Sequence, residues 1–168
     1  MIMEPIINRV ANSKLITLDL DEFIPSESIT AIPIAEGLYE GLILKEKDFR
    51  NWVNQLVSKY QDQVLTIIDT KDAIVPKWAY LLLSTALSSK GNTIYFSDKE
   101  KALERLILDK VNSQFASSLA ERSMVIIKGC GKLDLSGEFY GELAKLLRPK
   151  CKSLMFGEPC STVPIYKA

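Results

Sequence analysis

Val64, Leu65, Thr66, Ile67 and Ile68 form an uninterrupted run of apolar and β-branched residues. A continuous run of this kind, rather than alternation with polar residues, is typical of a strand that is covered on both faces of a parallel sheet. Similar runs recur at intervals of roughly thirty residues, which is the length of a strand–helix–strand unit. They occupy residues 93–96, 124–127 and 153–156.

The segments between these runs have helical patterns. Pro76 suits the first turn of a helix over residues 77–88, which is apolar enough to be buried. Residues 97–100 have the spacing of a capping box, and Ser136 is the candidate cap of a third helix, which Pro149 ends. This alternation predicts an α/β fold, a single domain with a mainly parallel four-stranded sheet of repeated βα units and right-handed crossovers.

The first third of the chain is expected to add an N-terminal edge strand and an amphipathic helix. Residues 15–20 alternate between apolar and polar side chains, which predicts the edge strand. The apolar side chains between Phe49 and Tyr60 follow helical spacing, which predicts the helix. No linker is long enough to divide the chain, so residues 1–168 are expected to form one domain, with an extension of about residues 1–45 packed on its core.

Composition argues against several classes of protein. The chain has 168 residues, of which 47% are hydrophobic and 25% charged, as in one ordinary globular domain. Its 21 basic and 21 acidic residues cancel, which argues against a nucleic-acid partner. No apolar run approaches the ~20 residues of a membrane span, and the start of the chain lacks a secretory pattern. We therefore expect a soluble cytoplasmic protein whose three cysteines stay reduced.

The chain contains no histidine. Its absence removes Ser-His-Asp and Cys-His catalysis and also the commonest metal ligand. Any catalytic base would have to be a carboxylate, a lysine, a tyrosine or a thiolate. The sequence requires no cofactor, and it leaves open whether the protein is an enzyme.

Two cysteines follow the last two apolar runs. Cys130 lies between Gly129 and Gly131, and Cys160 comes shortly after the last run. Because ligands bind beyond the carboxyl ends of parallel strands, both thiols are expected at one edge of the sheet, with Cys151 at the opposite edge. The other polar or glycine candidates beyond the strand ends are Gly157, Glu158, Ser161, Thr162, Asp69 and Asp98.

Each candidate also has a structural interpretation. A free cysteine is commonly a small buried apolar side chain, most plainly at Cys151, and Asp69 and Asp98 have the character of turn and cap residues. Zinc and iron–sulfur clusters usually need four ligands, so a metal at Cys130 and Cys160 would need carboxylates or a dimer that presents two pairs. Nucleophilic, sulfur-transfer or redox chemistry needs one accessible thiolate, whose pKa nearby cations such as Lys128 or Lys132 would lower.

Several stretches resemble an uncharacterised bacterial family, domain of unknown function 2480. The likeness covers nearly the whole chain, and its last stretch is the most specific. It rests on residues 8–11 and 15–18, 40–42 and 46–50, 76–80, 128–130 and 157–164. The family supplies no established activity, but the resemblance implies iron–sulfur cluster assembly proteins as partners.

Two functions therefore stay open. In the first, Cys160 and Cys130 form a cysteine-centred site that handles sulfur, a redox event or a metal, as an accessory to iron–sulfur assembly. In the second, the chain is a noncatalytic interaction module, with a homodimer as one form, that uses residues 23–46 and an exposed tail at residues 163–168. An enzyme that uses Asp69, Asp72 or Asp98 as its base has no supporting constellation in the sequence.

Overall fold

The computed structural model describes residues 15–120, 123–129, 131–158 and 160–168. The chain divides into two compact units, which we describe separately. Unit 1 holds the described residues up to Ile24 together with Glu104–Ala168, and unit 2 holds Pro25–Leu103. The organisation as one domain, expected from the sequence, stays a prediction.

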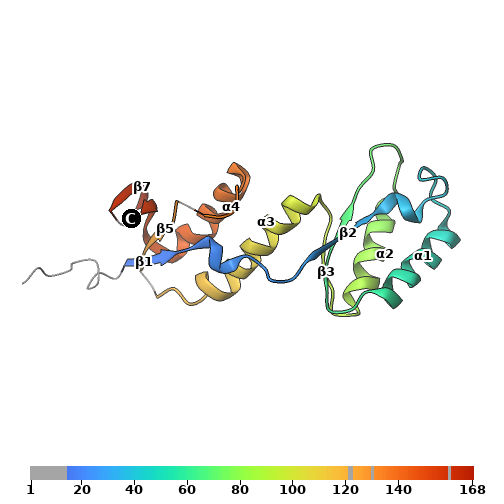
Figure 1. Cartoon of the computed structure of the whole chain (residues 1–168), viewed down its shortest axis with the longest axis horizontal. Coiled ribbons are helices and arrows are strands. Elements are labelled where there is room, and N and C mark those ends of the chain that lie inside the picture. Colours follow the sequence, from blue (N-terminus) through green and yellow to red (C-terminus); the bar gives the residue numbers. More distant parts are fainter. Residues whose placement is uncertain (1–14, 121–122, 130, 159) are drawn as a thin grey trace, which may run out of the picture. The chain divides into compact units, whose positions relative to one another are not determined.

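Unit 1 contains a four-stranded sheet in the order β1-β5-β6-β7 (Figure 1). The first three strands in this order are parallel, and β7 runs antiparallel to β6. The α/β class and the mainly parallel four-stranded sheet are thus confirmed, and β1 lies at an edge as its alternation predicts. The strands are β1 (Leu15–Leu18), β5 (Ser123–Ile127), β6 (Cys151–Glu158) and β7 (Ser161–Lys167).

Helix α4 (Gly137–Leu147) connects β5 with β6. Ser136 caps it as predicted, since its Oγ accepts a hydrogen bond from the Phe139 backbone N at 3.1 Å. Helix α3 (Lys99–Lys110) crosses from unit 2 into unit 1 and continues as a π-helical turn, η3 (Val111–Ala116). Two 3₁₀ turns complete the described part of unit 1, namely η1 (Leu20–Phe23) and η4 (Arg148–Lys150).

Unit 2 contains a three-stranded parallel sheet in the order β2-β3-β4. The sequence prediction of one sheet from the four apolar runs needs correction here, because the first two runs pair in this sheet and the last two in the other. Apolar runs specify burial but not which strand lies beside which. The strands are β2 (Ile29–Pro33), β3 (Val64–Ile68) and β4 (Thr93–Tyr95).

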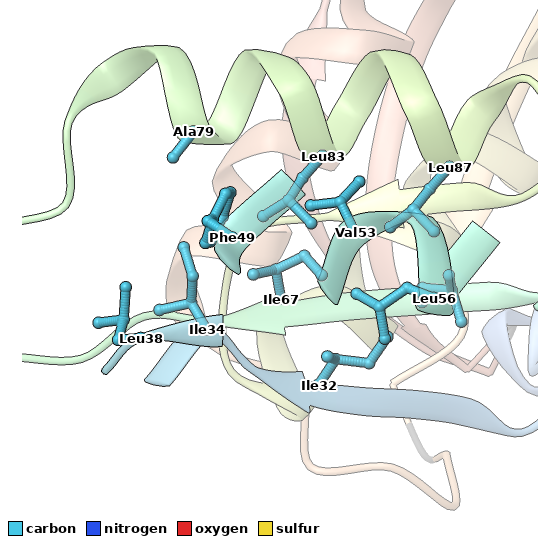
Figure 2. Packing of buried hydrophobic residues seen from close by; sticks show 11 residues of the cluster. Ile32, Ile34, Leu38, Phe49, Val53, Leu56, Ile67, Ala79, Leu83 and Leu87 are labelled. Atoms are coloured by element: carbon cyan, nitrogen blue, oxygen red, sulfur yellow. The ribbon is translucent and has the colours of Figure 1, made fainter. Parts of the chain in front are cut away.

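The core of unit 2 lies between this sheet and two helices, α1 (Glu46–Lys59) and α2 (Lys77–Ser88) (Figure 2). Helix α1 has the predicted amphipathic face, with Phe49 fully buried. Helix α2 buries one face rather than its whole surface, since Leu81 is 69% exposed. A 3₁₀ turn, η2 (Ile34–Gly37), follows β2. The side chains that meet in Figure 2 include Ile32, Val53, Leu56, Ile67, Leu83 and Leu87.

Candidate functional site

The predicted cysteine edge lies at the carboxyl ends of β5 and β6 in unit 1. Cys160 lies between β6 and β7 and is exposed. Cys130 lies outside the described residues. Cys151 is buried at the first position of β6, at the other end of the strand as predicted, and burial raises the pKa of its thiol.

Two glycines bring separate chain segments into contact at this edge. A Cβ on Gly129, after β5, would lie 3.2 Å from the Cα of Gly157 and 3.3 Å from the ring of Phe156. Gly157 itself has a φ of +120°, and a Cβ there would lie 2.5 Å from the Ser161 carbonyl oxygen. Glycine suits both positions because it has no Cβ to fit. The loop after β5 and the end of β6 therefore touch through their backbones.

The remaining polar candidates of this edge flank the connection between β6 and β7. Gly157 pairs with Thr162 and Glu158 pairs with Ser161 in the antiparallel register. Ser161 is exposed, whereas Glu158 and Thr162 are half-buried. Cys160 thus lies between two strands whose neighbouring ends pair through their backbones.

Two carboxylates that follow β1 accept hydrogen bonds at the same edge from residues that follow β5. Lys128 Nζ donates to Asp19 Oδ2 at 2.6 Å, and the Lys132 backbone N donates to Asp21 Oδ1 at 2.8 Å. The hydrogen bond from Lys128 lowers the pKa of Asp19, and the same bond raises the pKa of Lys128. Asp19 and Asp21 were not among the predicted site residues, because they lie in and just after the alternating segment of residues 15–20 rather than after one of the four apolar runs.

Lys128 was expected to lower the pKa of a cysteine. In the structure its ammonium group bonds to Asp19, and the negative charges of Glu158 and Asp21 also raise its pKa. A thiolate at this edge would therefore meet a positive charge that is largely compensated by carboxylates. Lys128 would therefore stabilise a cysteine thiolate less than the sequence suggests.

A small pocket lies beside the Asp19–Lys128 ion pair. Gly131 and Tyr140 also line it, and its volume is about 10 Å³, which is room for about one water molecule. Burial raises the pKa of the Tyr140 hydroxyl, and the charge of Asp134 adds to this shift. The pocket is too small for a substrate.

Asp69 and Asp98 follow strands of the other sheet, in unit 2. Asp69 Oδ1 accepts a hydrogen bond from the Tyr80 hydroxyl at 2.8 Å, and burial followed by this bond raises the pKa of Tyr80 to about 12. Asp98 Oδ1 accepts from the Lys101 backbone N at 2.8 Å, so Asp98 rather than Ser97 caps α3. Both aspartates thus have the structural partners of turn and cap residues.

Metal ligands do not gather in the described ranges. Among these residues there is no group of three or more Cys, Asp or Glu side chains that could hold a metal ion. In the same part of the chain, each helix is too short or too polar to cross a bilayer.

Comparison with known proteins identifies a family. No curated protein and no solved structure matches the chain. One family model, described as "Protein of unknown function (DUF2480)", matches residues 4–168. Because this match spans nearly the whole sequence, the chain belongs to the DUF2480 family, as its resemblance predicted.

Proposed function

We propose that the carboxyl edge of the sheet in unit 1 is a thiol redox site, with Cys160 as the attacking thiol and Cys130 as the resolving thiol. The observation that supports it most is the contact between Gly129 and Gly157 beside an exposed Cys160. Cys130 directly follows Gly129, and Cys160 comes three residues after Gly157. Both cysteines are therefore close in sequence to a point where two backbones touch.

The lengths of chain involved are compatible with a disulfide. Consecutive Cα atoms are about 3.8 Å apart, and a disulfide joins Cα atoms roughly 4.4–6.8 Å apart. One residue beyond Gly129 and three residues beyond Gly157 are enough to bring two Cα atoms to this separation.

The reaction would be thiol–disulfide exchange with a partner that carries a disulfide. The Cys160 thiolate attacks one partner sulfur and forms a mixed disulfide, while the other partner sulfur leaves as a thiolate and takes up a proton. The Cys130 thiolate then attacks the Cys160 sulfur, and the second partner thiolate leaves and is protonated. The partner gains two electrons and two protons, and the chain ends with a Cys130–Cys160 disulfide.

A metal-centred version of this site has less support. Among the described residues, Cys160 belongs to no group of three or more Cys, Asp or Glu side chains that could hold a metal ion. A role beside iron–sulfur assembly proteins stays a prediction from the resemblance.

The test is redox titration of a Cys151→Ser variant in glutathione buffers, with disulfides identified by peptide mass spectrometry. We expect a Cys130–Cys160 disulfide whose fraction follows the ratio of oxidised to reduced glutathione. In a Cys130→Ser variant, the mixed disulfide of Cys160 with glutathione should accumulate instead. Failure to detect the Cys130–Cys160 disulfide at any ratio would contradict the proposal.

A second candidate, the noncatalytic interaction module, is favoured by a tight turn in unit 2. Tyr39 and Ile43 exchange backbone hydrogen bonds of 2.8 and 3.0 Å around Glu40 and Gly41, which both have positive φ. Tyr39, Leu42 and Ile43 are 45%, 49% and 55% exposed. Apolar side chains held out on an ordered turn are typical of a protein-binding surface.

The other surface predicted for this candidate needs correction, because residues 163–167 are not a tail but part of β7. The candidate is tested by comparing the proteins captured by wild type with those captured by a Tyr39→Ser, Leu42→Ser, Ile43→Ser variant. Leu81→Ser, at another exposed apolar position of unit 2, is the control. A specific partner should bind to wild type and to the Leu81→Ser control but not to the turn variant. Equal capture of that partner by wild type, control and turn variant would reject this surface.

A further inference from the structure

The chain on both sides of Cys130 is hydrogen-bonded to the end of β1 and to the turn that follows it. The Lys128 backbone N donates to the Leu18 carbonyl at 2.9 Å, and the Lys132 backbone N donates to Asp21 Oδ1 at 2.8 Å. Cys130 lies midway between these two lysines in the sequence. The residues before and after the cysteine are therefore held by one other segment of unit 1.

The turn that receives the second bond, η1, is itself anchored in unit 1. Its side chains Leu20 and Phe23 are buried. Asp19 caps the turn, since its Oδ1 accepts from the Asp21 backbone N at 3.0 Å. The other oxygen of the same carboxylate, Oδ2, accepts from Lys128 Nζ at 2.6 Å. The turn can therefore support the loop after β5, because its own side chains are packed and capped.

The two glycines beside Cys130 contact different segments. Gly129 touches Gly157 at the end of β6, whereas a Cβ on Gly131 would lie 3.2 Å from Asp21 Oδ1. Asp21 therefore lies beside the residue that directly follows the cysteine.

We propose, on the basis of the thiol function proposed above, that Asp21 is a positioning residue for the thiol site. It holds the chain beside Cys130 in the arrangement that the disulfide with Cys160 requires. Closing a disulfide orders the backbone of the loop that carries it, and this ordering costs free energy. A loop that is already held has less freedom to lose, so the bond to Asp21 favours the disulfide over the two thiols.

The bond needs an acceptor oxygen at position 21 rather than a charge. Asparagine keeps a side-chain carbonyl oxygen and loses the charge, whereas alanine loses both. Glu22, an exposed carboxylate in the same turn, supplies the matched control. Glu22→Ala removes one negative charge from η1 and leaves the bonds of Asp19 and Asp21 in place.

The test measures the disulfide equilibrium with glutathione on the full chain, with the Cys151→Ser variant as parent. The dithiol loses two electrons and two protons to oxidised glutathione, which becomes two glutathione thiols. At a fixed concentration of reduced glutathione, Asp21→Ala should need roughly five- to tenfold more oxidised glutathione than the parent for half-formation of the Cys130–Cys160 disulfide, since one hydrogen bond is worth that factor. Asp21→Asn should stay close to the parent, and Glu22→Ala should leave the midpoint unchanged.

A bond that only stabilised the fold would lower the thermal stability of Asp21→Ala without moving this midpoint. Thermal unfolding verifies that each variant is folded at the temperature of the titration. If Asp21→Ala is not folded, Asp21→Leu replaces it, because leucine is close to aspartate in size and also has no acceptor.

Three results would overturn the role of Asp21 while leaving the proposed function in place. They are an unchanged midpoint in the folded alanine or leucine variant, an equal shift in Asp21→Asn, and an equal shift in Glu22→Ala. If the parent itself forms no Cys130–Cys160 disulfide at any ratio, the proposed function is wrong and the role of Asp21 falls with it.

Discussion

The backbones of Gly129 and Gly157 approach so closely that a methyl group on Gly129 would lie 3.2 Å from the Cα of Gly157. This contact lies just beyond Ile127 and Phe156, the last residues at which β5 and β6 pair with each other. It joins the loop after one strand to the end of the next. The close approach of these two segments therefore requires glycine at both positions, because a larger residue at either one would push the segments apart.

Gly157→Ala should lower the free energy of unfolding of the protein by about 2–4 kcal/mol, because strained φ costs ~1–3 kcal/mol and steric overlap adds to it. The φ of +120° disfavours any Cβ, and this one would also lie 2.5 Å from the Ser161 carbonyl oxygen. Denaturant unfolding followed by circular dichroism measures the change.

Gly141→Ala is the matched control within the same unit. Gly141 lies in the interior of α4, and a Cβ there would meet nothing within 4 Å. Alanine is favoured over glycine in a helix, so this variant should gain roughly 0.5–1 kcal/mol. A loss of stability in the Gly141 variant, or none in the Gly157 variant, would contradict the assignment of close backbone contact to one glycine and open space to the other.

Asn92→Ala should lower the free energy of unfolding by about 2–4 kcal/mol, because it leaves three backbone groups, each at least partly buried, without their partner. The Asn92 side chain is 6% exposed, accepts from the Gln63 backbone N at 2.9 Å, and donates to the carbonyls of Tyr60 and Leu87 at 3.1 and 3.0 Å. It therefore ties the ends of α1 and α2 to the start of β3.

Tryptophan fluorescence suits the measurement on Asn92, since Trp52 and Trp78 both pack against the core of unit 2. Asn54→Ala, at an exposed position of α1, is the control and should change the free energy of unfolding by less than about 0.5 kcal/mol. Equal effects of the two substitutions would show that the Asn92 network contributes little.

The sequence predicted local elements well and strand neighbours poorly. Residues 64–68 coincide with β3, the spacing from Phe49 predicts α1, and Ser136 caps α4. These features depend on periodicity and capping, which are local. The division into two sheets depends on which strands pair, and β2, the added partner of β3, lies in a segment rich in proline and glycine where no strand was expected.

The candidate site was also predicted only in part, because some of its contacts join residues that are far apart in the sequence. The exposed Cys160 and buried Cys151 follow from their positions at the two ends of one apolar run. The bond between Lys128 and Asp19 joins residues 109 positions apart, so no local pattern indicates it. Long-range charge pairing changes the electrostatics of a site without leaving a motif in the sequence.

Tyr80 should be a late-titrating tyrosine, with a pKa of about 12 caused first by burial and then by its hydrogen bond to Asp69. An unfolded tyrosine titrates near pH ~10. Because the folded pKa is raised, the contribution of Tyr80 to stability is full below pH ~10 and is lost as pH rises through about 12. Tyrosinate absorbance in an alkaline titration measures this.

Tyr80→Phe should remove the component that titrates near pH 12 and reduce the alkaline loss of stability. Asp69→Asn should lower the pKa of Tyr80 only in part, since burial, the larger cause, remains. If the Tyr80→Phe variant instead lost tyrosinate absorbance near pH ~10 and kept the component near pH 12, Tyr80 would ionise with the exposed tyrosines, and the prediction would be wrong.

Pro164→Thr should promote self-association through β7. This strand lies at an edge of its sheet, Val163 and Ile165 are 60% and 55% exposed, and such an edge invites pairing with another chain. Pro164 lacks a backbone donor and lies opposite Met155, beside a shift in register, and both features discourage pairing.

One restored hydrogen bond is worth ~1 kcal/mol, so sedimentation velocity should show roughly five- to tenfold tighter association of the Pro164→Thr variant than of wild type. Adding Val163→Lys should reverse the effect, because a charge on an edge strand opposes pairing. If the Pro164 variant sediments as wild type does, Pro164 does not protect this edge.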